Sequence, residues 1–240
     1  MIIYEVSEDG GSRLDFLDKL ENLNIVHTVN LLPAGEPFHR TKYLNIMLDQ
    51  VETPVVANYD IDVLMPVESY EKCTNSIVKG KVDVYYPYVF GMGQYQIPTY
   101  ISRNEFNTNF DPNSLLSETL EHQVRWESVP LFYSEYGHCI FFNTEVYRKG
   151  GAENEEFKSY GPEDKERGVR FKKLGYSVKW LDSVIFHFEH HRGNDSSHTN
   201  PFIEHNNSLF ERISNMREEE LAQYYSEIYY RKDYDKMNQF

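Results

Sequence analysis

Residues 55–62 read Val-Val-Ala-Asn-Tyr-Asp-Ile-Asp, an apolar run that ends in two carboxylates separated by one residue. Thr53-Pro54 precedes the run, and the residue before a proline is disfavoured in a helix. Val55 to Tyr59 is therefore predicted to be a buried strand that begins after a helix has ended. The strand belongs to a series of strands that alternate with helical segments along the chain. This alternation predicts an α/β fold whose sheet has substantial parallel character.

Hydrophobic periodicity extends the same pattern over most of the chain. Strands are predicted over residues 2–6, 25–32, 55–59, 82–86, 139–143, 176–181 and 184–188. Helices are predicted over residues 14–20, 43–51, 66–80, 114–123 and 162–174, and one or two helices over residues 207–230. The rest of residues 91–130 is irregular and polar. No linker divides the chain, so we expect one catalytic domain, residues 1–206, followed by a helical C-terminal extension, residues 207–240.

The composition excludes several classes of protein. The 240 residues include 24 basic and 38 acidic side chains, a formal net charge of −14, whereas nucleic-acid binders present a basic face. The aromatic content of 15% argues against global disorder. No apolar run approaches the ~20 residues that span a bilayer, and MIIYEVSEDGG does not resemble a signal peptide. We expect a soluble cytoplasmic protein in which Cys73 and Cys139 are structural.

The carboxylates of Asp60 and Asp62 are the first candidate site. Ligands gather at the carboxyl ends of strands in open α/β sheets, and alternate residues of an extended segment point the same way. The two aspartates could therefore meet one divalent cation. A second copy of the pattern, Asp233-Tyr234-Asp235, lies in the polar tail. The position at a strand end, rather than the tripeptide itself, favours a site at Asp60 and Asp62.

The segment Gly161-Pro162-Glu163-Asp164-Lys165-Glu166 is the second candidate. Gly161 and Pro162 begin a predicted helix with acids in its first turn, and ordinary helix capping would produce the same arrangement. The aromatic loop over residues 157–160 favours a cleft instead. A carboxylate at a helix N-terminus stays ionised near neutral pH, as a general base must. Both interpretations remain open on the residues alone.

The third candidate is His187-Phe188-Glu189-His190-His191-Arg192, which follows the apolar strand Val184-Ile185-Phe186. A lone histidine is most often structural. Histidines at i and i+3 after a strand end, beside a third histidine and an arginine, fit a site for a cation and a phosphate. Arg192 could pair with phosphate oxygens.

Together, and in this order, these segments resemble the GT-A glycosyltransferases, most closely the β-1,4-galactosyltransferase-like group and bacterial polysaccharide-synthesis enzymes. Phe38 to Asn45 is similar to the family's Phe-Asn-Arg-Ala-Lys-Leu-Leu-Asn segment. Gly150-Gly151 through Tyr160-Gly161-Pro162-Glu163-Asp164 is similar to its Gly-Phe and Trp-Gly-Gly-Glu-Asp-Asp-Asp signature. His187 to Arg192 corresponds to its Met-X-X-His-X-Arg segment. The chain departs from the family at Tyr160, Pro162 and His187, and in its first strand, which runs into Ser7-Glu8-Asp9.

The resemblance implies a nucleotide-diphospho-sugar transferase fold, a Rossmann-like mixed sheet flanked by helices. It assigns Asp164 as the catalytic base, Asp62 and His190 as metal ligands with His187 and Asp60 beside them, and Glu163 and Tyr160 to the acceptor site. The resemblance places three residues on the nucleotide side of the site, Asp60, Arg40 and Phe38. Asp9 is placed there by its position only. The irregular region that contains Trp126 is expected to shape the acceptor site or a lid.

The implied reaction is transfer of a hexose or N-acetylhexosamine from a UDP-sugar to a glycan hydroxyl, with inversion, in polysaccharide biosynthesis. It would depend on Mn²⁺ or Mg²⁺. The expected partners are the UDP-sugar donor and a glycan or lipid-linked glycan acceptor, with no nucleic acid, and peripheral contact with the inner face of a membrane stays open. The alternatives are a retaining transferase of the same fold, a non-catalytic nucleotide-sugar or glycan-binding module, and a metal-dependent phosphohydrolase built on the histidines.

Overall fold

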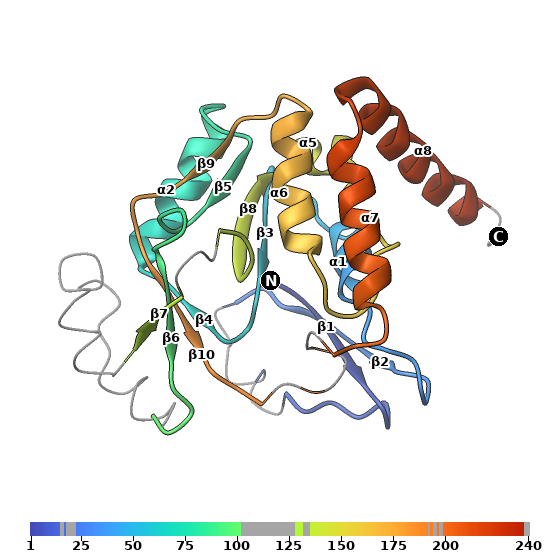
Figure 1. The fold of residues 1–240 in the computed structure, drawn as a ribbon. Helices are drawn as coiled ribbons and strands as arrows, with labels where there is room; N and C mark the ends of the chain where they lie inside the picture. Colours follow the sequence, from blue (N-terminus) through green and yellow to red (C-terminus); the bar gives the residue numbers. More distant parts are fainter. Residues whose placement is uncertain are drawn as a thin grey trace. The chain divides into compact units, whose positions relative to one another are not determined.

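A computed structural model describes residues 1–14, 17, 23–101, 128–131, 135–191, 193, 196 and 199–237, with the backbone alone for 229–237 (Figure 1). The chain divides into two compact units. Unit 1 comprises Met1–Glu52, Glu153–Glu163 and Arg192–Glu211, and unit 2 comprises Thr53–Ala152, Asp164–His191 and Arg212–Phe240.

Unit 1 contains a parallel pair of strands, β1 (Ile2–Ser7) and β2 (Val26–Leu31). Helix α1 (Arg40–Leu48) packs on β1, and the ring of Tyr43 on α1 stacks on that of Tyr4 with centroids 5.3 Å apart. Helix α7 (Ile203–Asn215) continues past the boundary of the unit at Glu211. The 153–163 segment contacts both helices: Asn45 of α1 donates to the Glu153 carbonyl over 3.0 Å, and Asn206 of α7 donates to the Lys158 carbonyl over 2.7 Å.

The first sheet of unit 2 has the strand order β3-β8-β5-β9. Its strands are β3 (Val55–Tyr59), β8 (Cys139–Asn143), β5 (Val84–Tyr86) and β9 (Val178–Trp180). The strand β8 is antiparallel to both β3 and β5, and β5 is parallel to β9. Because Tyr59 pairs with Cys139, the end of β3 lies beside the residues that precede β8.

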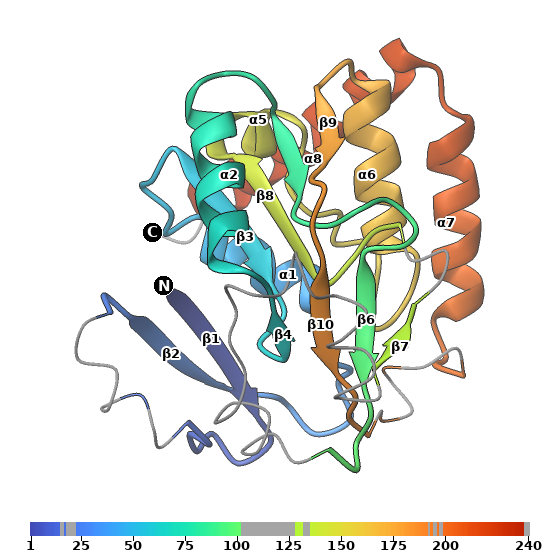
Figure 2. The same cartoon turned by 90° about the vertical axis from the view of Figure 1, so that its left-hand side faces the viewer.

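The second sheet of unit 2 has the order β4-β10-β6-β7, with β10 between β4 and β6 (Figure 2). Its strands are β4 (Val63–Leu64), β10 (Ile185–Phe188), β6 (Gln94–Ile97) and β7 (Val129–Pro130). Here β10 is antiparallel to β4 and parallel to β6. The register sets His187 opposite Val63, one residue after Asp62.

Helices cover both faces of the first sheet. Helix α2 (Val67–Val78) contacts β3, β5 and β8, whereas α5 (Thr144–Lys149) and α6 (Glu163–Lys173) supply aromatic rings to the opposite face. Adjacent residues of a strand point to opposite faces: Phe141 meets Tyr70 of α2, and Phe142 meets Tyr147 of α5 and Phe171 of α6. The expected α/β fold with a mixed sheet flanked by helices is confirmed.

Helix α8 (Glu218–Met237) is fixed to α6 by a buried polar network. The Tyr225 hydroxyl donates to Glu166 over 2.6 Å, and Glu166 also accepts from Arg170 over 2.9 Å. Arg170 donates in addition to the carbonyls of Gly150 and Ala152, and its guanidinium lies 4.1 Å from the centre of the Tyr225 ring. The C-terminal helix therefore fixes the middle of α6.

The structure corrects the interpretation of residues 91–130 as irregular apart from one helix, because β6 and β7 lie there. It also adds α5 and β4, which periodicity did not predict. Among the described strands, three of the seven pairings are parallel, so the sheets are mixed. The predicted helix over residues 114–123 and most of that over residues 14–20 lie outside the described residues. The boundary at residue 206 stays a prediction.

Within the described part of the chain, no helix has both the length and the apolar character needed to cross a bilayer.

Candidate functional site

The turn that follows β3 carries Asp60 and Asp62, as the sequence predicts. Backbone hydrogen bonds fix it on two sides. The Asp60 amide donates to the carbonyl of His138 over 2.9 Å, and the Asp62 carbonyl accepts from the amide of Phe188 over 2.9 Å. The turn is thereby tied to the residue before β8 and to the end of β10, so the Asp62 side chain faces His187 on β10 and His190 just after it.

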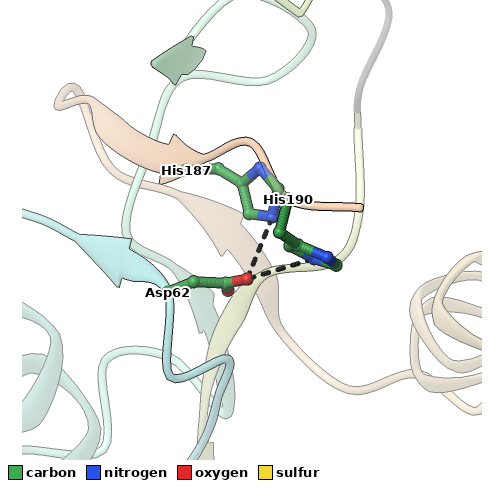
Figure 3. A group of neighbouring side chains, drawn as sticks. All are labelled: Asp62, His187 and His190. Atoms are coloured by element: carbon green, nitrogen blue, oxygen red, sulfur yellow. Dashed lines mark ion pairs between the residues drawn. The ribbon is translucent and has the colours of Figure 1, made fainter. Parts of the chain in front are cut away.

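Three side chains converge at this turn: Asp62, His187 and His190 (Figure 3). The Asp62 Oδ2 atom lies 3.5 Å from Nε2 of His187 and 3.2 Å from Nε2 of His190. One ligand atom from each residue lies within 4.8 Å of the other two. The side chains are 15%, 7% and 40% exposed respectively, so the group is enclosed on the His187 side and open on the His190 side.

The charge of Asp62 and the hydrogen bonding of His190 favour binding of a cation. Burial raises the pKa of Asp62, but the neighbouring imidazoles of His187 and His190 outweigh it and bring the net pKa below its usual value. The carboxylate is therefore charged at neutral pH. The Nδ1 atom of His190 donates to the carbonyl of His191 over 2.9 Å, because a carbonyl can only accept. In the neutral imidazole this leaves Nε2, the atom that faces Asp62, as the nitrogen able to bind a metal, the arrangement usual for a histidine that does so.

The donor set fits a transition-metal ion. Two imidazoles and one carboxylate suit ions such as Mn²⁺, whereas Mg²⁺ and Ca²⁺ favour oxygen ligands alone. The Nδ1 atom of His187 is enclosed and has no hydrogen-bond partner among the described residues. Asp60 lies at the same turn but is not part of the group of three.

Asp164 is the second residue of α6, in the same unit. Its Oδ1 atom pairs with the guanidinium of Arg167, one turn along the helix. The side chain of Arg167 is 1% exposed and that of Asp164 is 28% exposed, so the buried arginine orients a carboxylate that solvent can reach. On the other side, a Cβ atom on Gly137 would come within 3.1 Å of Oδ2 of Asp164. The carboxylate therefore packs directly against the Gly137 backbone.

His138 belongs to the site, although no pattern in the sequence pointed to it. It has a positive φ of 60°, and its ring centroid lies 4.6 Å from that of His187. Burial is the main reason that the pKa of the His138 imidazole falls below its ordinary value. Gly137 and His138 precede a predicted strand, and no hydrophobic periodicity in the sequence marks them as part of a site. Only the pairing of β3 with β8 reveals that His138 lies beside Asp60.

The residues assigned to the nucleotide side lie in unit 1. Asp9 is exposed, accepts from the Gly11 amide over 3.0 Å and pairs with Arg13, and these contacts lower its pKa. Phe38 is 42% exposed and its ring lies 5.2 Å from that of Tyr43. Arg40 is the first residue of α1.

The residues assigned to the acceptor lie at the end of the 153–163 segment of unit 1. The carbonyl of Tyr160 accepts from the side-chain amides of Asn200 and Asn206, over 2.8 Å and 3.1 Å. Gly161 follows, and a Cβ atom there would come within 2.7 Å of Asn206. Glu163 is 7% exposed and begins α6. Trp126 and Arg192 lie outside the described residues.

No protein-family model matches the chain, and no curated protein matches it in sequence. Among solved structures, the mannosyltransferase PcManGT from Pyrobaculum calidifontis, in complex with GDP-Man and Mn²⁺, is 12% identical over 78% of this chain, with a TM-score of 0.46. The chain spans 46% of that protein's length.

Drosophila β1,4-galactosyltransferase 7 in complex with xylobiose is 15% identical, over 79% of this chain and 71% of its own, with a TM-score of 0.39. A variant of that enzyme in complex with manganese, UDP-Gal and xylobiose is 14% identical over 90% of this chain and 79% of its own length, with a TM-score of 0.40. At these values the likeness assigns no function to this chain.

Proposed function

We propose that this chain is a metal-dependent GT-A glycosyltransferase that moves a hexose or N-acetylhexosamine from a nucleotide-diphosphate sugar, preferentially a UDP-sugar, to a glycan hydroxyl. The observation that carries the proposal is the group formed by Asp62, His187 and His190 at the end of β3. It joins residues from the two distant segments of sequence that resemble the metal-binding segments of the family.

The proposed base, Asp164, lies close to this group because both contact the consecutive residues Gly137 and His138. Gly137 packs against the carboxylate of Asp164, and the next residue, His138, has its ring against His187. The candidate metal group and the Asp164 carboxylate thus lie against two consecutive residues, His138 and Gly137, of unit 2. This proximity favours a single reaction centre over separate structural roles for the acidic helix turn and the histidines.

Asp62, His187 and His190 would hold Mn²⁺. When bound, the ion neutralises the diphosphate and makes the nucleoside diphosphate a better leaving group. Asp60, Arg40, Phe38 and Asp9 are proposed to contact the nucleotide.

Asp164 would take the proton from the acceptor hydroxyl as that oxygen attacks the anomeric carbon from the face opposite the diphosphate. The bond from the anomeric carbon to the diphosphate breaks as the new glycosidic bond forms, so the configuration inverts. Arg167 orients the Asp164 carboxylate for this step. Glu163, Tyr160 and Trp126 are proposed to position the acceptor, and polysaccharide biosynthesis is the proposed context.

The first test is a thermal-shift screen of UDP-sugars and GDP-sugars, each with and without Mn²⁺. A ligand that binds only the folded chain raises the melting temperature, so one sugar nucleotide should stabilise the protein and Mn²⁺ should strengthen the effect. Asp62→Asn should abolish the Mn²⁺-dependent part. Asp233→Asn is the matched control, since it makes the same change in the second Asp-X-Asp sequence. A chain that no sugar nucleotide stabilises would contradict the proposal.

Hydrolysis of the stabilising nucleotide sugar then separates an enzyme from a binding module. Slow Mn²⁺-dependent release of the nucleoside diphosphate is expected of a transferase offered water in place of its acceptor. Phosphate release from simple esters without a nucleotide would indicate a phosphohydrolase instead. NMR of the anomeric proton tests the stereochemistry, and a product with retained configuration would refute the role of Asp164 as base.

A further inference from the structure

His138 contacts both of the segments that carry the metal-binding side chains. Its carbonyl accepts a hydrogen bond of 2.9 Å from the amide of Asp60, which lies two residues before Asp62 in the chain. Its ring lies against the ring of His187, with centroids 4.6 Å apart and planes inclined by 48°. One residue before β8 is thus in contact with the turn after β3 and with strand β10.

The backbone around His138 is held in an unfavourable conformation. Its φ of 60° follows a φ of 98° at Gly137, and a left-handed conformation is unfavourable for a residue with a side chain. The Gly137 carbonyl accepts from the hydroxyl of Tyr88 over 3.0 Å and from the amide of Cys139 over 2.7 Å. These contacts hold the two residues in place. Strain that the surroundings maintain is found preferentially at functional sites.

Among the described residues, none supplies His187 with the hydrogen bond that normally orients a metal-binding histidine. In such residues the second ring nitrogen usually donates to a carbonyl or carboxylate, as Nδ1 of His190 does to His191. The Nδ1 atom of His187 is enclosed without a partner among the residues that the structure describes. Because the terminal torsion of histidine is broad, packing must fix the plane of this ring.

We propose that His138 is a positioning residue of the metal site: its ring holds the plane of His187 so that Nε2 faces Asp62, while its carbonyl fixes the turn that presents Asp62. The inference rests on the metal site of the proposed function. It predicts that the ring of His138 is needed for metal affinity, whereas its nitrogen atoms are not. The Nδ1 atom of His138 is itself enclosed and has no hydrogen-bond partner in the described part of the chain.

The test measures Mn²⁺ affinity directly, from the EPR signal of free Mn²⁺ during titration of the full chain. His138→Asn removes the ring, and asparagine tolerates a left-handed backbone. His138→Phe keeps a ring of similar size and loses both nitrogens. We expect His138→Asn to bind Mn²⁺ ~10–100-fold more weakly, the range typical for loss of a residue that orients a ligand, and His138→Phe to retain most of the affinity. His205→Asn, the same change on α7 of unit 1, should bind as the wild type does.

Each outcome decides the proposal. Wild-type affinity in His138→Asn would overturn it, and equal losses in both variants would show that a nitrogen, not the ring, is required. If His138→Asn does not fold, His138→Gly replaces it, and failure of both to fold would mean that the residue serves the fold rather than the metal site. If the wild-type chain itself does not bind Mn²⁺, the proposed function fails, which is distinct from failure of this inference.

Discussion

Replacing Tyr225 by phenylalanine removes one hydroxyl from the buried network that joins α8 to α6 and leaves the rest of the side chain in place. Tyr225, Glu166 and Arg170 are each at most 2% exposed. The lost hydrogen bond has a charged acceptor and a length of 2.6 Å. Such bonds contribute about 1.5–3 kcal/mol to folding.

The expected effect lies in the lower half of that range. Glu166 still accepts from Arg170 over 2.9 Å in the variant, so its carboxylate keeps a buried partner. The contact between the Arg170 guanidinium and the ring, at 4.1 Å, also remains. We expect the free energy of unfolding to fall by about 1.5–2 kcal/mol, which corresponds to a decrease of about 3–8 °C in melting temperature for a chain of this size.

Urea denaturation followed by circular dichroism measures the change, with calorimetry as the second probe. Tyr85→Phe, on β5, is the matched control because it removes the same hydroxyl from a partly exposed ring. A loss below about 0.5 kcal/mol, the range of ordinary surface substitutions, would refute the reasoning. Tyr225→Leu should cost more than Tyr225→Phe, because it also removes the ring that packs against Arg170.

Asp164→Asn should lower turnover of the donor sugar about 10²–10⁴-fold and leave Mn²⁺ affinity unchanged, as measured by nucleotide release and by EPR; wild-type turnover would exclude Asp164 as the base. Mn²⁺ at 100 times its dissociation constant should stabilise the chelator-treated chain by about 2.7 kcal/mol, and calorimetry should find no such gain in His187→Ala. The stability of the metal-free chain should decline as the pH falls below about 6.5. Burial lowers the pKa of His39 in the folded state, and the unfolded chain therefore binds a proton at a higher pH than the folded chain does. Urea titrations should give a smaller decline for His39→Gln, and equal declines would contradict this.

Local signals in the sequence were sufficient for the elements that bear the site. The apolar run from Val55 to Tyr59 predicts β3, which has those bounds. Gly161-Pro162 at one end and Gly175 at the other predict α6, which runs from Glu163 to Lys173. The roles assigned to Asp164, Glu163 and the nucleotide-side residues stay predictions, since geometry alone does not test them.

Features that depend on packing between distant segments could not be predicted. The guanidinium groups of Arg167 and Arg170 would suit an exposed helix face, yet both residues are 1% exposed and paired with acids one turn earlier on the helix. The role of His138 arises from the pairing of β8 with β3. Strand β6 is four residues long and mostly polar, and only its pairing with β10 and β7 defines it.

The path of the chain also limits how this protein can be re-engineered. It passes from one unit to the other after Glu52, Ala152, Glu163, His191 and Glu211, so neither unit is a continuous fragment that could be expressed or exchanged alone. A chimera that exchanges residues 153–163, the segment proposed to contact the acceptor, would have to include α7. Grafted without α7, the loop would lose Asn206, whose amide donates to the carbonyls of Lys158 and Tyr160.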